Sequence, residues 1–240
     1  MKNEVIKKEE TKEVVLGGDI YGTWGAGGGD DFEQSDVITP RIILLQKMSQ
    51  LVDDGSGKAG EFLDSIDKMI LSDGVNALEI IIIDKNKSWK VSDVNGNKPV
   101  YVRMEEFNSE TASASYEFEE NGIKMRRDKL FNYTCFVVKE KGGLENEMPY
   151  LFTLSRSAGQ VAKHLNTIIE KLRVMKKPSA ATTFLITSTK VTNDKGTWHI
   201  PEVKVGRPTT QEEAAVAFSW WESLKTGKVA IKAQDNEADF

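Results

Sequence analysis

Aromatic and cationic side chains alternate along several segments of this chain, and these residues offer the clearest chemistry. Lys90 follows Trp89, and Tyr101 lies two residues before Arg103. A ring that can stack on a base, next to a cation that can contact a phosphate, is what single-stranded nucleic acid requires of a protein surface. The pattern makes a second group of residues candidates for the same role: Arg126, Arg127, Lys190 and Trp198.

Enzyme chemistry has little support in the sequence. The chain has two histidines, His164 and His199, and one cysteine, Cys135, whose spacing does not match a zinc site. No serine, histidine and acid form a nucleophile motif, and no carboxylates follow a metal-nuclease pattern. We therefore expect a non-catalytic protein without metal or cofactor. Cys135 lies in an apolar run, which favours a core position, and a lone cysteine is typical of an intracellular protein.

The pair Asn95-Gly96 predicts a hairpin that would position the first candidates. A two-residue turn would set Val94 opposite Asn97, and would place Lys90 opposite Tyr101 and Ser88 opposite Arg103 on one exposed face. The other face would be buried and would hold Trp89, Val91, Val100 and Val102. A register shifted by one residue would exchange the faces and expose Trp89 together with Lys85 and Lys87.

Two further hairpins are expected. Asn121-Gly122 would join segments 115–118 and 123–127, with Tyr116 facing Arg127 beside a basic cluster that includes Lys124 and Lys129. Segments 181–192 and 197–205 would pair around residues 193–196, with Lys190 across from His199. A bulge is expected at Pro201, because proline cannot donate a hydrogen bond to a strand ladder.

Two helices complete the expected elements. A basic helix over 157–175 has the apolar period Val161, Leu165, Ile168, Ile169 and Leu172, with Ser157 and Gln160 spaced as a capping box. A C-terminal helix begins at the capping box Thr210 to Glu213 and ends near Leu224. Its expected buried stripe is Ala214, Ala217, Phe218, Trp221 and Leu224.

Charge is unevenly distributed along the 240 residues. Of the net charge of −5, residues 1–36 carry −5 and residues 229–240 carry −2, which leaves +2 for residues 37–228. We expect a disordered, acidic and glycine-rich N-terminal arm over 1–36, one folded nucleic-acid-binding domain over 37–228, and a flexible acidic tail over 229–240. No apolar run is long enough to span a membrane, and we expect a cytoplasmic protein.

The last eight residues, 233–240, are polar and acidic and end on an aromatic ring. They contain Asp235, Glu237, Asp239 and Phe240. This acidic, Phe-terminated end resembles the tails of single-stranded DNA-binding proteins, most closely the phage replication type. The resemblance implies an oligonucleotide-binding (OB) fold, a location inside the host bacterium, and a tail that recruits replication or repair proteins such as a polymerase, helicase-primase or nuclease.

The expected fold is β-rich α+β, an OB-like curved sheet or barrel with a basic helix between strands and a C-terminal helix. The expected function is to coat single-stranded DNA without strong sequence preference during phage replication, recombination or repair. Three alternatives stay open, namely a phage or host adaptor that does not touch DNA, a strand-annealing recombination protein and a nuclease. The sequence leaves self-association open as well.

Overall fold

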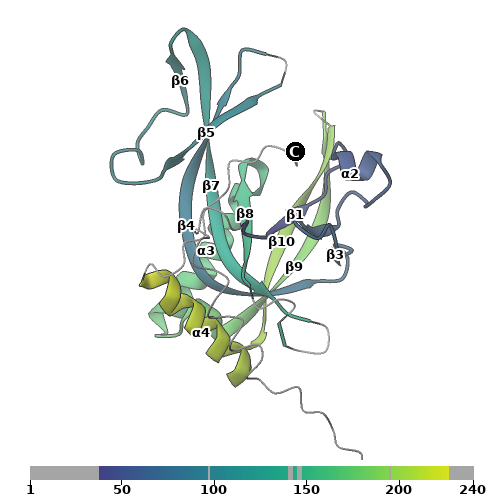
Figure 1. Cartoon of the computed structure of the whole chain (residues 1–240), viewed down its shortest axis with the longest axis vertical. Helices are drawn as coiled ribbons and strands as arrows, with labels where there is room; N and C mark the ends of the chain where they lie inside the picture. Colours follow the sequence, from purple (N-terminus) through teal and green to yellow (C-terminus); the bar gives the residue numbers. More distant parts are fainter. Residues whose placement is uncertain (1–37, 97, 140–142, 145–147, 195, 227–240) are drawn as a thin grey trace, which may run out of the picture. The chain divides into compact units, whose positions relative to one another are not determined.

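Long β-strands dominate the part of the chain that the structure describes. The structure is a computed structural model and describes residues 38–96, 98–139, 143–144, 148–194 and 196–226 (Figure 1). The predicted N-terminal arm and the C-terminal tail, with Asp235, Glu237, Asp239 and Phe240, lie outside these residues. No helix among the described residues is both long and apolar enough to cross a membrane.

The strands form one 10-stranded mixed sheet with the order β10-β9-β4-β7-β8-β1-β2-β3, to which β5 adds on β4 and β6 adds on β7. Neighbours are antiparallel except β1 and β8, which run parallel. The strands are β1 (Arg41–Leu44), β2 (Phe62–Asp64), β3 (Ile70–Ser72), β4 (Leu78–Asp93), β5 (Val100–Glu106), β6 (Glu117–Glu120), β7 (Ile123–Val137), β8 (Tyr150–Ser155), β9 (Thr182–Asn193) and β10 (Gly196–Pro208).

Two helices cover opposite faces of the central strand pair, β4 and β7. The isoleucine run of β4 alternates, so that Ile80 and Ile82 pack in one cluster with α3 (Gly159–Val174), whereas Ile81 and Ile83 pack in another with α4 (Gln211–Lys225). We call these the α3 face and the α4 face. The other helical segments are short: α2 (Gln50–Asp53), η2 (Arg156–Ala158) and η3 (Ser179–Ala181).

The two predicted helices are present, with differences in detail. The apolar stripe of α3 is confirmed, since Leu165 and Ile169 are buried, but its expected capping box at Ser157 is wrong because a 3-10 turn occupies that position. The capping box of α4 is confirmed at Thr210. The predicted stripe of α4 is partly wrong, because Phe218 and Trp221 face outward, whereas Ala217, Trp220 and Leu224 pack on the sheet.

The hairpin at Asn121-Gly122 forms as predicted. Both turn residues have positive φ, 52° and 77°, which fits a two-residue turn of the kind that follows the twist of the strands. Strand β6 pairs with the start of β7, and the Arg127 amide donates to the Tyr116 carbonyl at 2.7 Å. The predicted facing of these two residues is therefore confirmed.

The hairpin at Asn95-Gly96 forms with a different register. Val91 pairs with Arg103 and Ser92 pairs with Tyr101, so the expected pairings of Lys90 with Tyr101 and of Ser88 with Arg103 are wrong. The physical reason is a longer connection combined with a bulge, which leaves Val102 without a partner on β4. As a result, Val100 and Val102 are exposed rather than buried, whereas Trp89 is buried as expected. Asn97, the expected partner of Val94, lies outside the described residues.

Strands β9 and β10 pair as predicted at Lys190 and His199. Pro201 pairs in register with Ser188, so the expected bulge there is wrong, and the irregularity lies between Val205 and Pro208 instead.

The sheet curves strongly (Figure 1) but does not close into a barrel through a ladder between the described strands. Gln46, just after β1, bridges to β10 with its side chain. Its amide nitrogen donates to the His199 carbonyl at 3.1 Å, and its oxygen accepts from the His199 amide at 2.9 Å. One side chain thus satisfies backbone groups on β10 that a neighbouring strand would otherwise pair.

Candidate nucleic-acid interface

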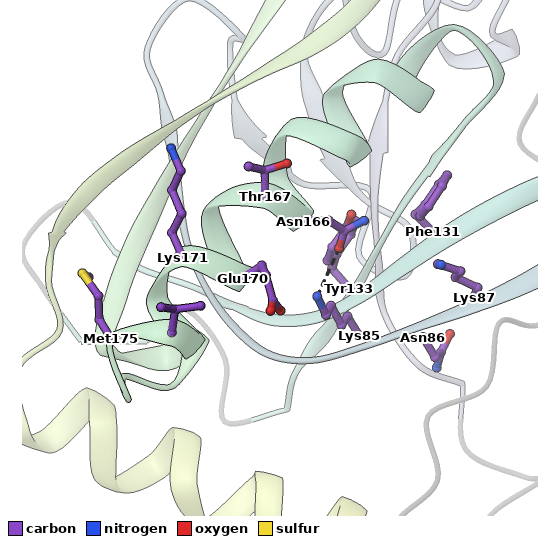
Figure 2. Close-up of a pocket in the computed structure, with 11 residues that line it drawn as sticks. Lys85, Asn86, Lys87, Phe131, Tyr133, Asn166, Thr167, Glu170, Lys171 and Met175 are labelled. Atoms are coloured by element: carbon purple, nitrogen blue, oxygen red, sulfur yellow. Dashed lines mark hydrogen bonds between the residues drawn. The ribbon is translucent and has the colours of Figure 1, made fainter.

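A groove of about 800 Å³ lies between α3 and the central strands (Figure 2). Strand β4 supplies Lys85, Asn86 and Lys87, β7 supplies Phe131 and Tyr133, and the remaining wall comes from α3 and the residue after it. We call this site the α3 groove. Its complete lining is Lys85, Asn86, Lys87, Phe131, Tyr133, Asn166, Thr167, Glu170, Lys171, Val174 and Met175.

A bulge in β4 explains why lysines line this groove. The pairing of β4 with β7 shifts between Ile82 and Asp84, and beyond the shift Lys85 pairs with Tyr133 and Lys87 with Phe131. Paired residues of an antiparallel ladder share a face. The α3 face of β4 therefore continues from buried isoleucines to exposed lysines, which lie beside α3 in the groove.

Lysine and aromatic side chains continue from the groove along the same face. The Lys87 ammonium lies 5.8 Å from the Phe131 ring centroid and 5.1 Å from that of Phe107. The Lys129 ammonium lies 4.6 Å from the Phe107 centroid and 4.9 Å from that of Trp89. We call Lys85, Lys87, Lys129, Phe107 and Phe131 the lysine–aromatic row.

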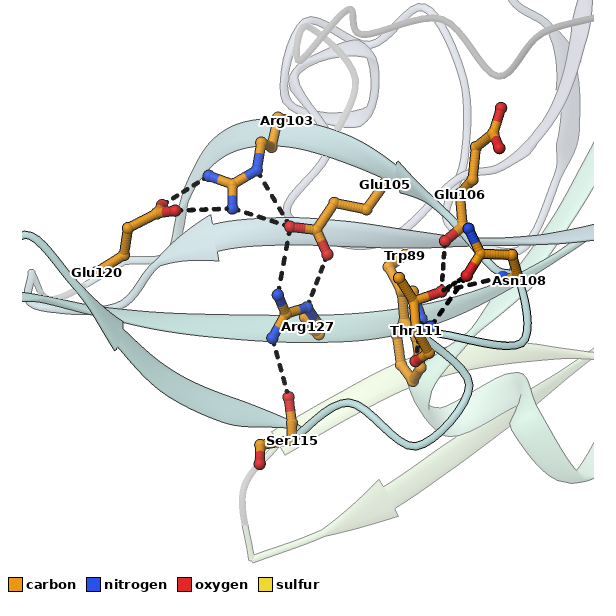
Figure 3. A network of polar contacts seen from close by, with 9 residues as sticks. All are labelled: Trp89, Arg103, Glu105, Glu106, Asn108, Thr111, Ser115, Glu120 and Arg127. Atoms are coloured by element: carbon orange, nitrogen blue, oxygen red, sulfur yellow. Dashed lines mark hydrogen bonds and ion pairs between the residues drawn. The ribbon is translucent and has the colours of Figure 1, made fainter.

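Trp89 supports this row from below. Its ring packs on Phe107 with centroids 5.4 Å apart, and its indole N–H donates to the Thr111 carbonyl at 3.2 Å. Thr111 and Asn108 tie the segment after β5 into a compact loop by several hydrogen bonds (Figure 3). Trp89 is buried, as the hairpin argument predicted, and in the structure it supports Phe107. It shares a face with Lys85 and Lys87, as the shifted register proposed.

The charges of the groove favour an anion. Its lining contains three lysines and one acid, Glu170. Burial lowers the pKa of Lys85, with a smaller opposing effect from Glu170. The Lys85 ammonium donates to the Asn166 side-chain oxygen at 3.4 Å (Figure 2). Glu170 pairs with Arg173 at 2.6 Å. That pairing lowers the pKa of the Glu170 carboxyl, so the acid stays ionised and offsets part of the positive charge.

Two of the predicted arginines form a carboxylate network (Figure 3). Arg103 pairs with Glu105 at 2.8 Å and with Glu120 at 2.7 Å, and Arg127 pairs with Glu105 at 2.7 Å. Hydrogen bonds from Arg127 and Arg103 lower the pKa of Glu105, with the Arg127 contribution the larger. The network joins β5, β6 and β7. Arg103 lies on the face of Trp89 and Val91, which corrects its expected place beside Lys90.

The other predicted residues lie in separate places. Lys90 and Tyr101 do share a face, with the ammonium 5.6 Å from the ring centroid. Arg126 pairs with buried Asp128 at 3.4 Å.

Lys190 and Trp198 belong to the β9–β10 hairpin, where burial and Lys190 lower the pKa of His199. The structure therefore does not unite the eight predicted residues in one surface.

The lysine–aromatic row was mostly missed by sequence reasoning. One signal is present in the sequence, since Lys85, Lys87 and Trp89 alternate, and so do Lys129, Phe131 and Tyr133. If the two segments had been known to pair with each other, their alternating lysines and aromatics would have predicted the row. The sequence patterns do not show that these segments pair, because they lie about forty residues apart in the chain.

Cys135 takes no part in this surface. Its side chain is buried in the α3-face core, as predicted, and burial raises the pKa of the thiol. Within the described ranges, no three or more His, Cys, Asp or Glu side chains are grouped so that they could hold a metal ion.

The fold and the groove together define a β-rich protein with one curved mixed sheet and a cationic groove on one face. Residues 18–230 match the sequence model of the Pam3 phage gp34-like protein family. This match covers most of the chain, and the protein belongs to that bacteriophage family. The comparisons with curated proteins and with solved structures found no match.

Proposed function

We propose that this protein binds single-stranded DNA along the α3 groove and coats it without strong sequence preference. Lysines of the row would contact phosphates, and Phe131 and Phe107 would stack on bases. The main observation behind the proposal is that the Lys87 ammonium lies within 6 Å of the ring centroids of both Phe107 and Phe131 on an open surface. Base stacking on aromatic side chains contributes roughly 1–3 kcal/mol per base and depends little on sequence.

The geometry supports a single strand over a duplex. Stacking on Phe131 needs a base whose face is free, and a paired base in a duplex has both faces covered by its neighbours. The groove also has a wall on each side, α3 and the β4–β7 ladder, and its volume of about 800 Å³ is modest. Contacts between lysines and phosphates would serve DNA and RNA alike, so an RNA oligomer belongs in the same test.

The test is fluorescence anisotropy of a labelled oligo-dT at two salt concentrations, with duplex and RNA of equal length as competitors. We expect single strands to compete better than duplex and the affinity to fall with salt. The double variant Lys85→Ala/Lys87→Ala should reduce the slope of log affinity against log salt by about 1.4, because each lost phosphate contact contributes about 0.7. The matched control is Lys204→Ala, which removes an exposed lysine of β10.

The variant Glu170→Gln should change the DNA affinity in the opposite direction to the lysine variants. Removing the one acid of the lining should tighten binding, by about twofold, because the neighbouring lysines then attract phosphate without an opposing charge. Absence of binding, equal competition by duplex, or equal losses in Lys204→Ala and the double variant would each reject the groove.

The wider role is part of the same proposal. A coating protein of a phage would act in replication, recombination or repair in the cytoplasm of the infected bacterium, and its acidic C-terminal residues, Asp235 to Phe240, would recruit partner enzymes. Deletion of 233–240 should then tighten DNA binding and abolish partner binding. An adaptor protein would keep its partner and show no DNA binding, and a strand-annealing protein would join complementary strands.

A further inference from the structure

The outer face of α4 carries an aromatic pair that the fold leaves exposed. Phe218 and Trp221 are 58% and 39% exposed, and their rings stack with centroids 5.9 Å apart and an interplanar angle of 28°. The Lys225 ammonium lies 6.0 Å from the Trp221 centroid. The inner face of the same helix, through Ala217, already packs on the sheet. The outer aromatics are therefore extra apolar surface, of the kind that marks contact sites.

We propose that this face is a contact between two copies of the chain, with α4 packed antiparallel against α4 of a second copy around a two-fold axis at Phe218. A two-fold axis brings one patch against itself, so the patch must be complementary to itself. In this helix the large aromatics lie toward the C-terminal half and small exposed Ala215 lies toward the N-terminal half. An antiparallel partner sets each aromatic against the small residue.

Helical spacing gives the pairing. With the two Phe218 rings in contact on the axis, Trp221 lies against Ala215 of the second copy, because each residue is three positions from the axis in opposite directions. Lys225 then lies opposite Gln211 of the second copy, one residue before Glu212. The acidic first turn of one helix therefore meets the basic last turn of the other, and symmetry repeats this contact.

This charge complementarity favours a second copy over an unrelated occupant. Both halves of the match are present on a single helix: an acid in the first turn at Glu212 and a base in the last turn at Lys225, with the exposed aromatic pair and Glu222 between them. The proposed pairing does not depend on DNA binding. The helix lies on the α4 face, opposite the α3 groove, so that a dimer leaves both grooves open. Two open grooves on one particle would bind a long strand with avidity.

A contact made by one helix from each copy is small, so the dimer should be weak and depend on concentration. The test is analytical ultracentrifugation of the full chain over about a hundredfold range of concentration. We expect a reversible monomer–dimer equilibrium. Phe218→Glu places two like charges on the axis and should raise the dissociation constant at least about tenfold. The control Val75→Glu alters an apolar side chain that is 83% exposed elsewhere, and should change nothing.

Charge exchange tests the antiparallel register independently of folding. Glu212→Lys and Lys225→Glu should each weaken the dimer, and the double variant should restore it, with circular dichroism confirming the helix content of each. A wild-type chain that stays monomeric at every concentration would overturn the proposal and leave the face to another occupant. A dimer that is indifferent to Phe218→Glu, or that the double variant does not restore, would overturn it equally.

Discussion

The Lys85 side chain is partly desolvated, and its charge is also one of those proposed to contact phosphate. Burial lowers the pKa of Lys85 in the folded protein, so the unfolded chain binds more protons over that range. The free energy of unfolding therefore rises as pH increases through the lowered pKa. At neutral pH the partly desolvated Lys85 charge reduces stability, which is a cost expected at a binding site rather than in a structural core.

Lys85→Met should accordingly make the protein more stable at neutral pH and weaken its binding to oligo-dT. Methionine keeps the length of the side chain and removes the charge. Urea unfolding at neutral and alkaline pH measures the first effect, and the variant should lose the part of the alkaline stabilisation that Lys85 causes. A variant that is less stable and binds DNA unchanged would contradict the role given to Lys85.

Phe131 is one of the two rings proposed to stack on a base. Phe131→Leu keeps an apolar side chain against the α3-face core but removes the ring. We expect about a fivefold loss of affinity for oligo-dT, equivalent to about 1 kcal/mol. The dependence of affinity on salt should stay the same because no charge is lost, and a thermal melt checks the fold. A changed salt slope with the affinity intact would argue against stacking.

At the scale of the element, the carboxylate network fastens β6 and β5 to β7, and its least exposed pair is Arg127 with Glu105. The side chains of Arg127 and Glu105 are 16% and 17% exposed. Removing Arg127 takes away the stronger of the two arginine partners of Glu105 and leaves only Arg103 to balance its charge. Arg127→Ala should therefore destabilise the protein by about 1–3 kcal/mol, measured by urea unfolding. Lys124→Ala, an exposed lysine on the same strand, is the control and should change stability little.

The same network sets a pH dependence. Because Arg127 and Arg103 lower the pKa of Glu105, the stability that the pairing provides is present at neutral pH and is lost as pH falls through the lowered pKa. Glu105→Gln should be less stable than the wild type at neutral pH, and this difference should shrink in acid. A constant difference across the acid range would mean that the carboxylate charge is not what stabilises this region.

Elements with a local signal could be predicted from the sequence, whereas their register could not. The turn at Asn121-Gly122 and the Thr210 cap depend on neighbouring residues and were correct. The hairpin at Asn95-Gly96 was found, but its bulge opposite Val102 was not, and that single extra residue moved Arg103 to the other face. Bulges follow from packing at a distance, which short-range patterns do not record.

At the scale of the molecule, the sequence indicated a β-rich chain with two helices but not the arrangement of its strands. Strand β4 pairs with β5, β7 and β9, and these partners come from three separate parts of the chain. The α3 groove depends on this arrangement, because Lys87 and Phe131 become neighbours only through the β4–β7 ladder. The residues predicted from the sequence and those of the α3 groove are therefore of similar types but lie mostly at different positions.

The two faces of the sheet have separate tasks in this account. The α3 face carries the groove proposed for DNA, and the α4 face carries the aromatic pair proposed for self-association. Variants of one face should therefore leave the other property unchanged, because the cores beneath α3 and α4 are distinct clusters.

The most direct test of the central claim is photochemical crosslinking of the full chain to an oligonucleotide carrying a halogenated uracil, followed by peptide mapping. Aromatic rings stacked on that base react preferentially. The account predicts crosslinks at Phe131 or Phe107, which lysines border on the α3 face, and their loss in Lys85→Ala/Lys87→Ala. Crosslinks at Trp198 on the β9–β10 hairpin instead, or none with a strand that binds, would contradict a DNA site in the α3 groove.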